Sequence, residues 1–369
     1  MESALKHDLK EIIQHFQLEG EFLDAFLYGS GHIHDTYASR FKTQEGIVRY
    51  IHQWINHDVF KEPEKVMENI ERVTRYARER ILAAGGDPLR ETLNLIPAVD
   101  GNSFYKTPEG NYWRSYVFIE GARTFDKVES VKQVYNAAKA FGIFQKMLSG
   151  LPGGRLHETI PNFHHTRKRF EAFLEAATKD VKNRARRVKA EIDFVLERER
   201  DVSIIVDMLA QEKIPERVTH NDTKLNNVMI DDKTGEGICV IDLDTVMPGS
   251  ALYDFGDAVR IGASSAAEDE QDLSKVGVDL AMFDCLANGY LDAARDILTP
   301  TEMEFLAFSA KLLTFECGVR FLTDYLAGDV YFKIHRESHN LDRCRTQFKM
   351  VAEMEQKMDQ MIAIVNRYR

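Results

Sequence analysis

Two linked segments in the middle of the chain carry most of its structural information: Arg217-Val-Thr-His-Asn-Asp-Thr-Lys-Leu-Asn-Asn-Val-Met-Ile230 and Gly237-Ile-Cys-Val-Ile-Asp-Leu-Asp244. Each contains a short apolar run, and the turn-rich residues 231–237 separate the two runs. Two strand-like runs on either side of turn residues predict a β-hairpin with a longer loop. That hairpin would return Asp242 and Asp244 to the end of the sheet where Asp222 and Asn227 leave the preceding loop.

The polar residues at this end of the hairpin indicate a phosphotransfer centre. Three carboxylates and an amide would repel one another without a cation, and such oxygen ligands suit Mg²⁺. The order His-x-Asp-x-x-x-x-Asn, strand, turn, strand, Asp is that of the protein-kinase-like phosphotransferases, and His220-Asn-Asp222 resembles the aminoglycoside-phosphotransferase branch of them. Taken singly, Asp222 and Asn227 could be turn or cap residues, but five positions in order favour the catalytic interpretation.

The length and composition predict a two-lobed soluble enzyme. The chain has 369 residues, of which 44% are hydrophobic and 29% charged, and its net charge is −11. A negative charge of this size argues against a nucleic-acid or anionic-membrane partner. No signal-peptide or membrane-spanning run is present, so we expect a cytoplasmic protein. We also expect a monomer, although no sequence feature fixes the oligomeric state. The four cysteines have no metal-ligand spacing and predict reduced thiols.

The first part of the chain predicts a small antiparallel sheet. Strand-like runs cover residues 22–28, 36–41, 47–55, 92–97 and 112–119. The first two runs are joined through Gly29-Ser30-Gly31, whose backbone N–H groups could cover nucleotide phosphates, although a plain hairpin turn is the alternative.

The third strand departs from the usual kinase pattern. Residues 47–55 contain no lysine, whereas kinases place one there to pair the phosphates. Arg49, His52 and Gln53 are the alternatives. The last strand of this region leads into Phe118, Ile119 and Glu120, the position of an interlobe hinge whose backbone would read the adenine edge.

Residues from about 128 onward predict a mostly helical lobe. The literal Asp254-Phe-Gly256 resembles a kinase metal-binding triplet but lies too far from Asn227 to follow a single hairpin. Asp242 is therefore the predicted metal ligand, and Asp254 or Asp257 is expected to cap a helix or brace the catalytic loop.

A line of charged residues follows one face of the predicted helix at residues 305–326. Glu316, Arg320 and Asp324 are spaced by four residues. Spacing alone favours an intrahelical salt-bridge ladder. The alternative is a cleft wall that orients a polyhydroxylated ligand.

Taken together, these motifs resemble those of the N-acetylhexosamine 1-kinase family from about residue 16 to 358. The shared segments are Tyr28-Gly-Ser-Gly-His-Ile33, Ile55-Asn56, Phe60, Thr219-His-Asn-Asp-Thr-Lys-Leu-Asn-Asn227, Ile241-Asp-Leu-Asp-Thr245, Met247-Pro-Gly-Ser250, Asp254-Phe-Gly-Asp257, Glu316-Cys-Gly318 and Arg320-Phe321. The resemblance implies an α+β, bilobal, protein-kinase-like fold, with an antiparallel-sheet N-lobe at residues 1–120 and a larger helical C-lobe at 121–369. It also implies ATP- and Mg²⁺-dependent phosphorylation of the anomeric hydroxyl of N-acetylglucosamine or N-acetylgalactosamine, with ATP and the sugar as small-molecule partners.

The resemblance also implies roles for single residues. Asp222 would be the base, and Asn227, Asp242 and Asp244 would hold the metal. The residues expected at the sugar are His32, Asp222, Arg320 and Tyr331, and those expected at the nucleotide are Gly29, Ser30, Gly31, Gln53, Phe118, Ile119 and Glu120. His34 stands where the family favours Asn.

Two alternatives remain open from the sequence. One is a related kinase for another sugar, an amino alcohol or an aminoglycoside, which would share the catalytic loop. The other is a nucleotide-binding pseudokinase, which the missing strand lysine permits and the intact Asp222, Asn227 and Asp242 disfavour. The sequence does not distinguish the two N-acetylhexosamine epimers.

Overall fold

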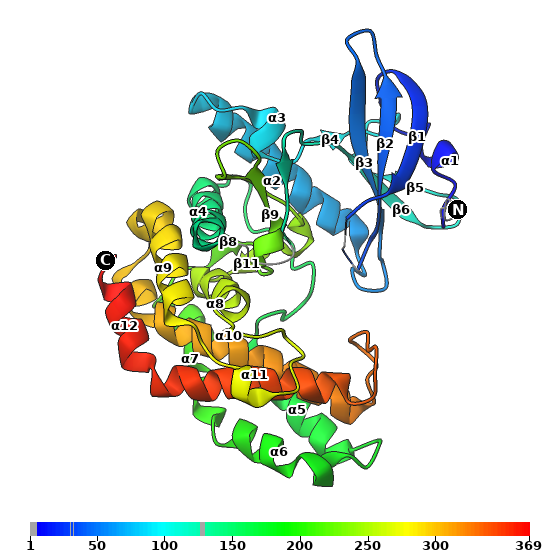
Figure 1. The fold of residues 1–369 in the computed structure, drawn as a ribbon. Coiled ribbons are helices and arrows are strands. Elements are labelled where there is room, and N and C mark those ends of the chain that lie inside the picture. Colours follow the sequence, from blue (N-terminus) through cyan, green and yellow to red (C-terminus); the bar gives the residue numbers. More distant parts are fainter. Residues whose placement is uncertain (1–5, 30, 32, 126–129) are drawn as a thin grey trace.

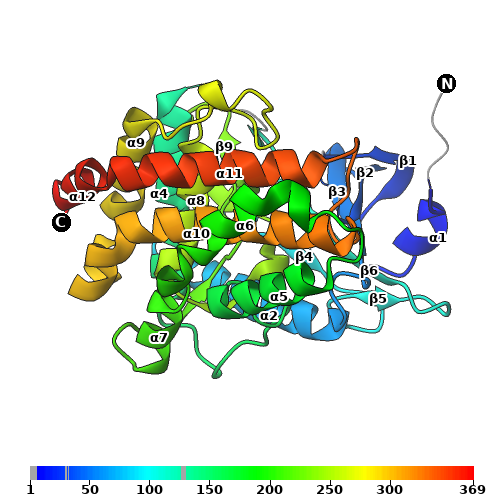
Figure 2. The same cartoon turned by 90° about the horizontal axis from the view of Figure 1, so that it is seen from below.

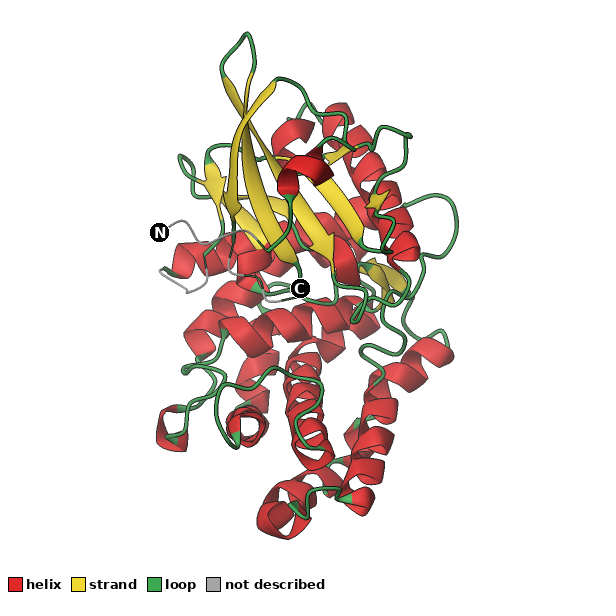
Figure 3. Cartoon of the chain, turned by 90° about the vertical axis from the view of Figure 1, so that its right-hand side faces the viewer, coloured by secondary structure: helices red, strands yellow, loops and turns green. Residues whose placement is uncertain are grey.

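The computed structural model describes residues 6–29, 31, 33–125 and 130–369, and it has two lobes (Figure 1). Most of the strands gather in one lobe, and the helices fill the other (Figure 3). The predicted α+β, bilobal, kinase-like fold is confirmed. The division at residues 120 and 121 stays a prediction.

The N-terminal lobe is built on a six-stranded antiparallel sheet. Its strand order is β1-β2-β3-β6-β4, and β5 also pairs with β6. The elements of this lobe are α1 (Leu9–Ile13), β1 (Glu21–Leu27), β2 (Asp35–Lys42), β3 (Ile47–Ile55), α2 (Pro63–Ala83), α3 (Pro88–Glu91), β4 (Leu95–Ile96), β5 (Tyr105–Lys106) and β6 (Tyr112–Val117).

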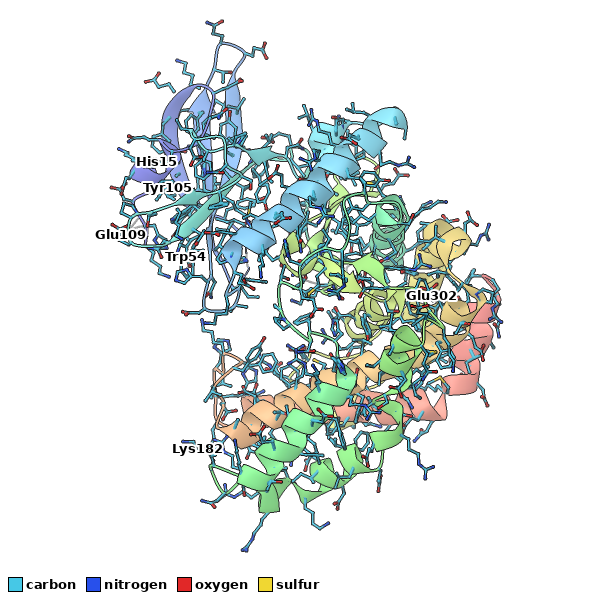
Figure 4. All side chains as sticks on the ribbon, turned by 180° about the vertical axis from the view of Figure 1, so that it is seen from behind. His15, Trp54, Tyr105, Glu109, Lys182 and Glu302 are labelled. Atoms are coloured by element: carbon cyan, nitrogen blue, oxygen red, sulfur yellow. The ribbon has the colours of Figure 1, made fainter. Side chains whose placement is uncertain are left out.

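One face of this sheet is apolar and is covered by α1. Tyr37, Tyr50 and Trp113 are buried there together with Leu9 and Ile12 of the helix. On the edge beyond them His15 stacks on Tyr105 with ring centroids 3.8 Å apart (Figure 4). The other face of the sheet is therefore free to carry the polar residues of the site.

The C-terminal lobe is a helical bundle around one large apolar core. Its helices are α4 (Val131–Leu148), α5 (Thr166–Lys179), α6 (Lys189–Leu196), α7 (Ile204–Ala210), α8 (Ala251–Gly262), α9 (Leu280–Ala294), α10 (Pro300–Ala327), α11 (His339–Gln356) and α12 (Met358–Asn366). The long helices α10 and α11 run side by side (Figure 2). Within the described residues, no helix is long and apolar enough to cross a membrane.

The predicted β-hairpin is present in this lobe. β9 (Val228–Asp231) pairs with β10 (Gly237–Val240), and β7 (Ala122–Arg123) extends the small sheet beside β9. A second ladder joins β8 (Arg217–Thr219) to β11 (Met247–Gly249). Arg217 Nε donates to Oε1 of the buried Glu302 at 2.7 Å, which anchors the start of β8 to α10.

Some predicted elements differ from the observed ones. The apolar spacing of residues 4–17 predicts one helix, but α1 ends at Ile13, and Phe16 forms a β-bridge with Ala98 instead. Residues 4 and 5 of the predicted range lie outside the described residues. The strand expected at residues 92–97 is reduced to β4, since residues 88–91 form α3. All four cysteines are unpaired, as predicted.

Candidate active site

Asp222 lies in the loop after β8, beside two groups that hydrogen-bond to it. Lys224 Nζ donates to Asp222 Oδ2 at 2.9 Å. Asn227 Nδ2 donates to the main-chain oxygen of Asp222 at 2.9 Å and to its Oδ2 at 3.3 Å. Although burial opposes it, the charge of Asp222 raises the pKa of Lys224. The loop therefore presents a carboxylate with a fixed cation beside it.

The backbone of the catalytic loop is held by two acids of α8. Asp254 accepts hydrogen bonds from the amides of His220 at 2.9 Å and Asn221 at 2.7 Å. Asp257 accepts from the amide of Thr223 at 3.0 Å. Both acids are buried, and they brace the loop as the sequence predicted. Burial raises the pKa of Asp254 to about 6.

Asp242 and Asp244 follow β10, where the hairpin returns to the loop. The Ile241 amide donates to the main-chain oxygen of Asn227 at 2.9 Å, which places this turn beside the catalytic loop. Asp242 has a left-handed φ of 59°, and a 3-10 turn, Leu243–Thr245, begins directly after it. Partial desolvation, together with the negative charges of Asp244 and Asp222, raises the pKa of Asp242. A cation at this position would relieve that repulsion.

Asp244 lies beside Asp242 but is paired with an arginine of the other lobe. Arg114 donates to both of its carboxylate oxygens, Nη1 to Oδ1 at 2.7 Å and Nη2 to Oδ2 at 2.6 Å. Both side chains are almost fully buried, at 2% and 1% exposed. Against the opposing effect of burial, the charge of Arg114 lowers the pKa of Asp244. The metal role of Asp244 stays a prediction, since both oxygens are already hydrogen-bonded.

His34 completes the group of potential metal ligands with Asp242 and Asp244. One ligand atom of each lies within 4.8 Å of the others. The Nδ1 of His34 accepts a hydrogen bond from the Asn56 amide at 3.1 Å, so a neutral His34 carries its proton on Nε2. That nitrogen faces Asp244 Oδ1 at 3.5 Å. His34 thus suits donation to Asp244 better than metal binding.

A buried cation, Arg114, reaches this site from β6, the strand next to β3. Gln53 lies opposite Arg114 across the β3–β6 ladder, and its Oε1 accepts from Arg114 Nε at 3.0 Å. Arg49 is used elsewhere, in a pair with Glu120. His52 is buried between Ser39 and Ser115, 2.7 Å from each hydroxyl. Of the three candidates in β3, only Gln53 reaches the site, as a support for Arg114.

The glycine turn and the hinge lie at the ends of the N-terminal strands. Gly29 has a left-handed φ of 79°, and a Cβ added at Gly29 or Gly31 would meet no atom within 4 Å. A phosphate could therefore approach this backbone closely. Ser30 and His32 lie outside the described residues.

At the hinge, Phe118 and Ile119 are buried and Glu120 is exposed. The Arg49 guanidinium lies 3.7 Å from the centroid of the Phe118 ring. Arg90 donates to the main-chain oxygen of Glu120 at 3.2 and 3.1 Å, so this carbonyl already has a partner. The nucleotide contacts predicted for these three residues stay predictions.

The charged line on α10 is not a salt-bridge ladder, and that interpretation is wrong. Glu316 pairs with His164 at 2.7 Å, and Asp324 accepts from the amides of Val330, Tyr331 and Phe332 at 2.8–2.9 Å. Both acids are thereby committed to positioning main chain and side chains around the site. Among the described residues, Arg320 makes no hydrogen bond or ion pair. Its contacts are with aromatic rings.

Arg320 instead lies among three aromatic rings. Its guanidinium carbon is 5.2 Å from the ring centroid of Phe163, 6.0 Å from that of Tyr331 and 5.5 Å from that of Phe332. Tyr331 is 61% exposed. Burial, followed by the nearby charge of Arg320, lowers the pKa of Arg169, so two guanidinium groups share this region.

Three residues of the site were missed from the sequence: Arg114, Lys224 and His164. Arg114 carried a usable signal, because a charged residue in the middle of an apolar central strand requires a buried partner. Lys224 lies two residues after Asp222 and could have been noticed there. His164 belongs to a run of histidines and cations at residues 157–169, a composition that predicts a solvated loop, and only the packing shows that His164 is buried.

Comparison with known proteins agrees with this geometry. Residues 30–285 match the family APH, described as the phosphotransferase enzyme family. The chain belongs to this family. The match begins within the glycine turn and includes the catalytic hairpin, so the phosphotransferase assignment rests on segments that form the site.

Solved structures of this kind share the fold across both lobes. An aminopropanol kinase associated with a microcompartment is 14% identical, with a TM-score of 0.59 and coverage of 96% of this chain and 98% of that one. A spectinomycin phosphotransferase in complex with ADP and spectinomycin is 14% identical, with a TM-score of 0.55 and coverage of 95% and 98%. A choline kinase from Cryptosporidium parvum is 16% identical, with a TM-score of 0.54 and coverage of 98% and 99%. At these identities the likeness shows the fold alone.

Proposed function

We propose that this phosphotransferase transfers the γ-phosphoryl group of ATP to the anomeric hydroxyl of N-acetylglucosamine or N-acetylgalactosamine, giving the sugar 1-phosphate. The observation that carries the proposal is that the protein has both a complete catalytic loop and a second group of residues suited to a sugar, which we call the substrate wall. The substrate wall is Arg320 of α10 with the surrounding rings of Phe163, Tyr331 and Phe332, and Arg320 makes no ion pair among the described residues. The motif resemblance to the N-acetylhexosamine 1-kinases supports the choice of sugar.

The reaction needs positioning more than covalent chemistry, because phosphoryl transfer passes through a loose transition state. Asp222 would orient the sugar hydroxyl toward the phosphorus and take its proton late in the reaction. Lys224, 2.9 Å from Asp222, would offset negative charge that develops beside the base. Together these groups order the acceptor without forming an intermediate on the protein.

The residues fit ATP and Mg²⁺. Asn227 uses its Nδ2 to hold Asp222, which leaves its Oδ1 as an acceptor for a cation beside Asp242. The open face over Gly29 and Gly31 leaves room for phosphates. When bound, Mg²⁺ would neutralise the charge of the nucleotide phosphates.

A neutral substrate suits the wall better than a cationic one. The acids Glu316 and Asp324 are consumed by hydrogen bonds within the protein. Arg169 and Arg320 remain, so a substrate ammonium group would meet like charges. A hydroxyl-rich ring with an acetamido group could accept from Arg320 and pack on the aromatic rings. This argues against the amino-alcohol alternative.

One assay separates the candidate substrates. ATP consumption is measured with N-acetylglucosamine, N-acetylgalactosamine, unacetylated hexoses, choline, aminopropanol and an aminoglycoside, with and without Mg²⁺. We expect turnover with the N-acetylhexosamines and a product labile to mild acid, as a sugar 1-phosphate is. Turnover with the cationic acceptors alone would overturn the sugar assignment. ATP binding without turnover of any acceptor would favour the pseudokinase.

Replacing Arg320 with alanine is expected to raise the KM for the sugar about 10- to 100-fold, because a charged hydrogen bond contributes about 1.5–3 kcal/mol. The KM for ATP should stay near the wild-type value, since the contacts of Arg320 are with Phe163, Tyr331 and Phe332 and not with the residues predicted at the nucleotide. Steady-state kinetics with each substrate varied in turn measure both constants.

The control for this variant is Arg167→Ala. Arg167 is an exposed arginine whose nearest acid is Asp207 at 3.8 Å. Its loss should leave both KM values unchanged. An Arg320→Ala enzyme with unchanged sugar KM would remove Arg320 from the substrate wall.

A further inference from the structure

A buried histidine, His164, lies directly behind the catalytic loop. It precedes α5 and is 7% exposed. Its Nε2 is 2.9 Å from the main-chain oxygen of Asn221, and its Nδ1 is 2.7 Å from Glu316 Oε1. Thr166 Oγ1 donates to the second Glu316 oxygen at 2.8 Å. His164 therefore connects the catalytic loop to α10, the helix that carries Arg320.

Each of the two hydrogen bonds of His164 requires a hydrogen on its own ring nitrogen, Nδ1 for Glu316 and Nε2 for Asn221. A main-chain carbonyl oxygen and an ionised carboxylate can only accept, so both ring nitrogens must donate and the ring is an imidazolium. A neutral imidazole has one N–H and would lose one of the two bonds. The charge of Glu316 raises the pKa of His164 against the effect of burial. The same pairing lowers the pKa of Glu316.

Other groups also act on this pair. The titratable or charged residues near it are Tyr253, Asp254 and Asp257 on α8, His165 and Arg169 at α5, and Arg320 on α10. The acids of α8 add to the stabilisation of the imidazolium, whereas Arg169 and Arg320 act on Glu316. Among the described residues, Glu316 is the ionised group that hydrogen-bonds directly to the ring.

The carbonyl that His164 holds belongs to the peptide leading into Asp222. Asn221 has a left-handed φ of 64°, an uncommon conformation for a residue other than glycine. Its N–H is held by Asp254 Oδ1 at 2.7 Å and its carbonyl by His164. Rotation of this peptide would turn the direction in which Asp222 leaves the backbone. Each end of Asn221 is thus fixed by a buried charged side chain.

We propose that His164 is a positioning residue for Asp222, holding the Asn221 carbonyl in place and linking it through Glu316 to the substrate wall on α10. The effect on turnover rests on the proposed function of Asp222. We call the two hydrogen bonds of His164, to the Asn221 carbonyl and to Glu316, the clamp. The clamp does not depend on which acceptor is phosphorylated.

The clamp also predicts a pH dependence with a definite sign. Because the pKa of His164 is raised, both of its hydrogen bonds are present at a pH below the ordinary pKa of histidine. One of the two bonds is lost as the pH rises through the pKa of His164 in the folded protein. Wild-type kcat should therefore have a limb that falls toward high pH. In Glu316→Gln that limb should move to lower pH, because the neutral amide no longer stabilises the imidazolium.

The first experiment tests the clamp without any substrate. Hydrogen exchange is measured for residues 219–224 in wild type, His164→Ala and the control His157→Ala. His157 also pairs with a glutamate, Glu68 at 2.8 Å, but at 34% exposure and away from the loop. We expect at least about tenfold faster exchange of this segment in His164→Ala alone. Wild-type exchange of the segment in a folded His164→Ala protein would overturn the proposal.

The second experiment tests positioning through turnover. In His164→Ala we expect kcat to fall by up to about 10²-fold, as small misplacements of a catalytic group do, with the KM for ATP unchanged and the high-pH limb absent. Added imidazole should restore part of kcat, because a cavity of about 160 Å³ already borders His164 and Asn221. A rise in KM with unchanged kcat, or a retained limb, would overturn the role. If wild type phosphorylates no acceptor, the proposed function fails while the exchange experiment still decides the clamp.

Discussion

Replacing Asp222 with asparagine is expected to lower kcat by about 10²- to 10⁴-fold, the usual contribution of a positioned base. The amide keeps the size of the side chain but has far too low a basicity to take the proton of the sugar hydroxyl. ATP affinity should change little, because Asn227 and Asp242 are untouched. Steady-state kinetics and calorimetric titration with an ATP analogue measure the two quantities.

The matched control for Asp222→Asn is Asp232→Asn in the adjoining hairpin. Asp232 is 42% exposed and pairs with Arg123 at 2.9 Å, so its loss should leave kcat unchanged. Asp242→Asn gives the opposite pattern to Asp222→Asn, with weaker Mg²⁺-dependent nucleotide binding. Near-native turnover in Asp222→Asn would remove this residue from the base role.

Replacing Arg114 with methionine is expected to lower the free energy of unfolding by about 3–5 kcal/mol, because it leaves the Asp244 carboxylate buried without its partner. Activity should fall as well, since Asp244 lies beside Asp242. Urea denaturation followed by circular dichroism measures the loss of stability. The double variant Arg114→Met/Asp244→Asn should recover much of the stability, because no unpaired charge remains, but not the activity.

The control pair is Arg40 and Asp24 in the same sheet. It is also a two-pronged arginine–aspartate pair, but its side chains are 46% and 43% exposed. Arg40→Met should change stability by no more than about 1 kcal/mol. Equal decreases in the free energy of unfolding in Arg114→Met and Arg40→Met would show that burial of the Arg114–Asp244 pair does not increase its contribution to stability.

The fold and the catalytic loop could be predicted because they depend on local sequence. The apolar runs around residues 231–237 have no alternative to a hairpin, and that hairpin brings Asp242 back to Asn227. The distinction between Asp242 and Asp254 also follows from chain length alone. Strand β3 was predicted with its observed bounds, residues 47–55, because its apolar run is local.

The partners of charged residues could not be predicted, because they come from distant parts of the chain. Arg114 and Asp244 are 130 residues apart, and His164 and Glu316 are 152 apart. The spacing of Glu316, Arg320 and Asp324 suggested a ladder, since sequence shows only neighbours on the same helix. In the folded protein, hydrogen-bond donors outside the helix satisfy the two buried acids better than exposed pairs on it would.

The amino-acid sequence by itself determined the two-lobed kinase-like fold and the convergence of Asp222, Asn227 and Asp242. Short-range periodicity, turn residues and hairpin length are enough to specify these features. Only the tertiary structure showed that Arg114 pairs with Asp244 of the other lobe and that Arg320, among the described residues, has aromatic rings and no acid as its direct partners. The physical reason is that a buried charge must find a partner, and which partner it finds depends on how separate elements pack together.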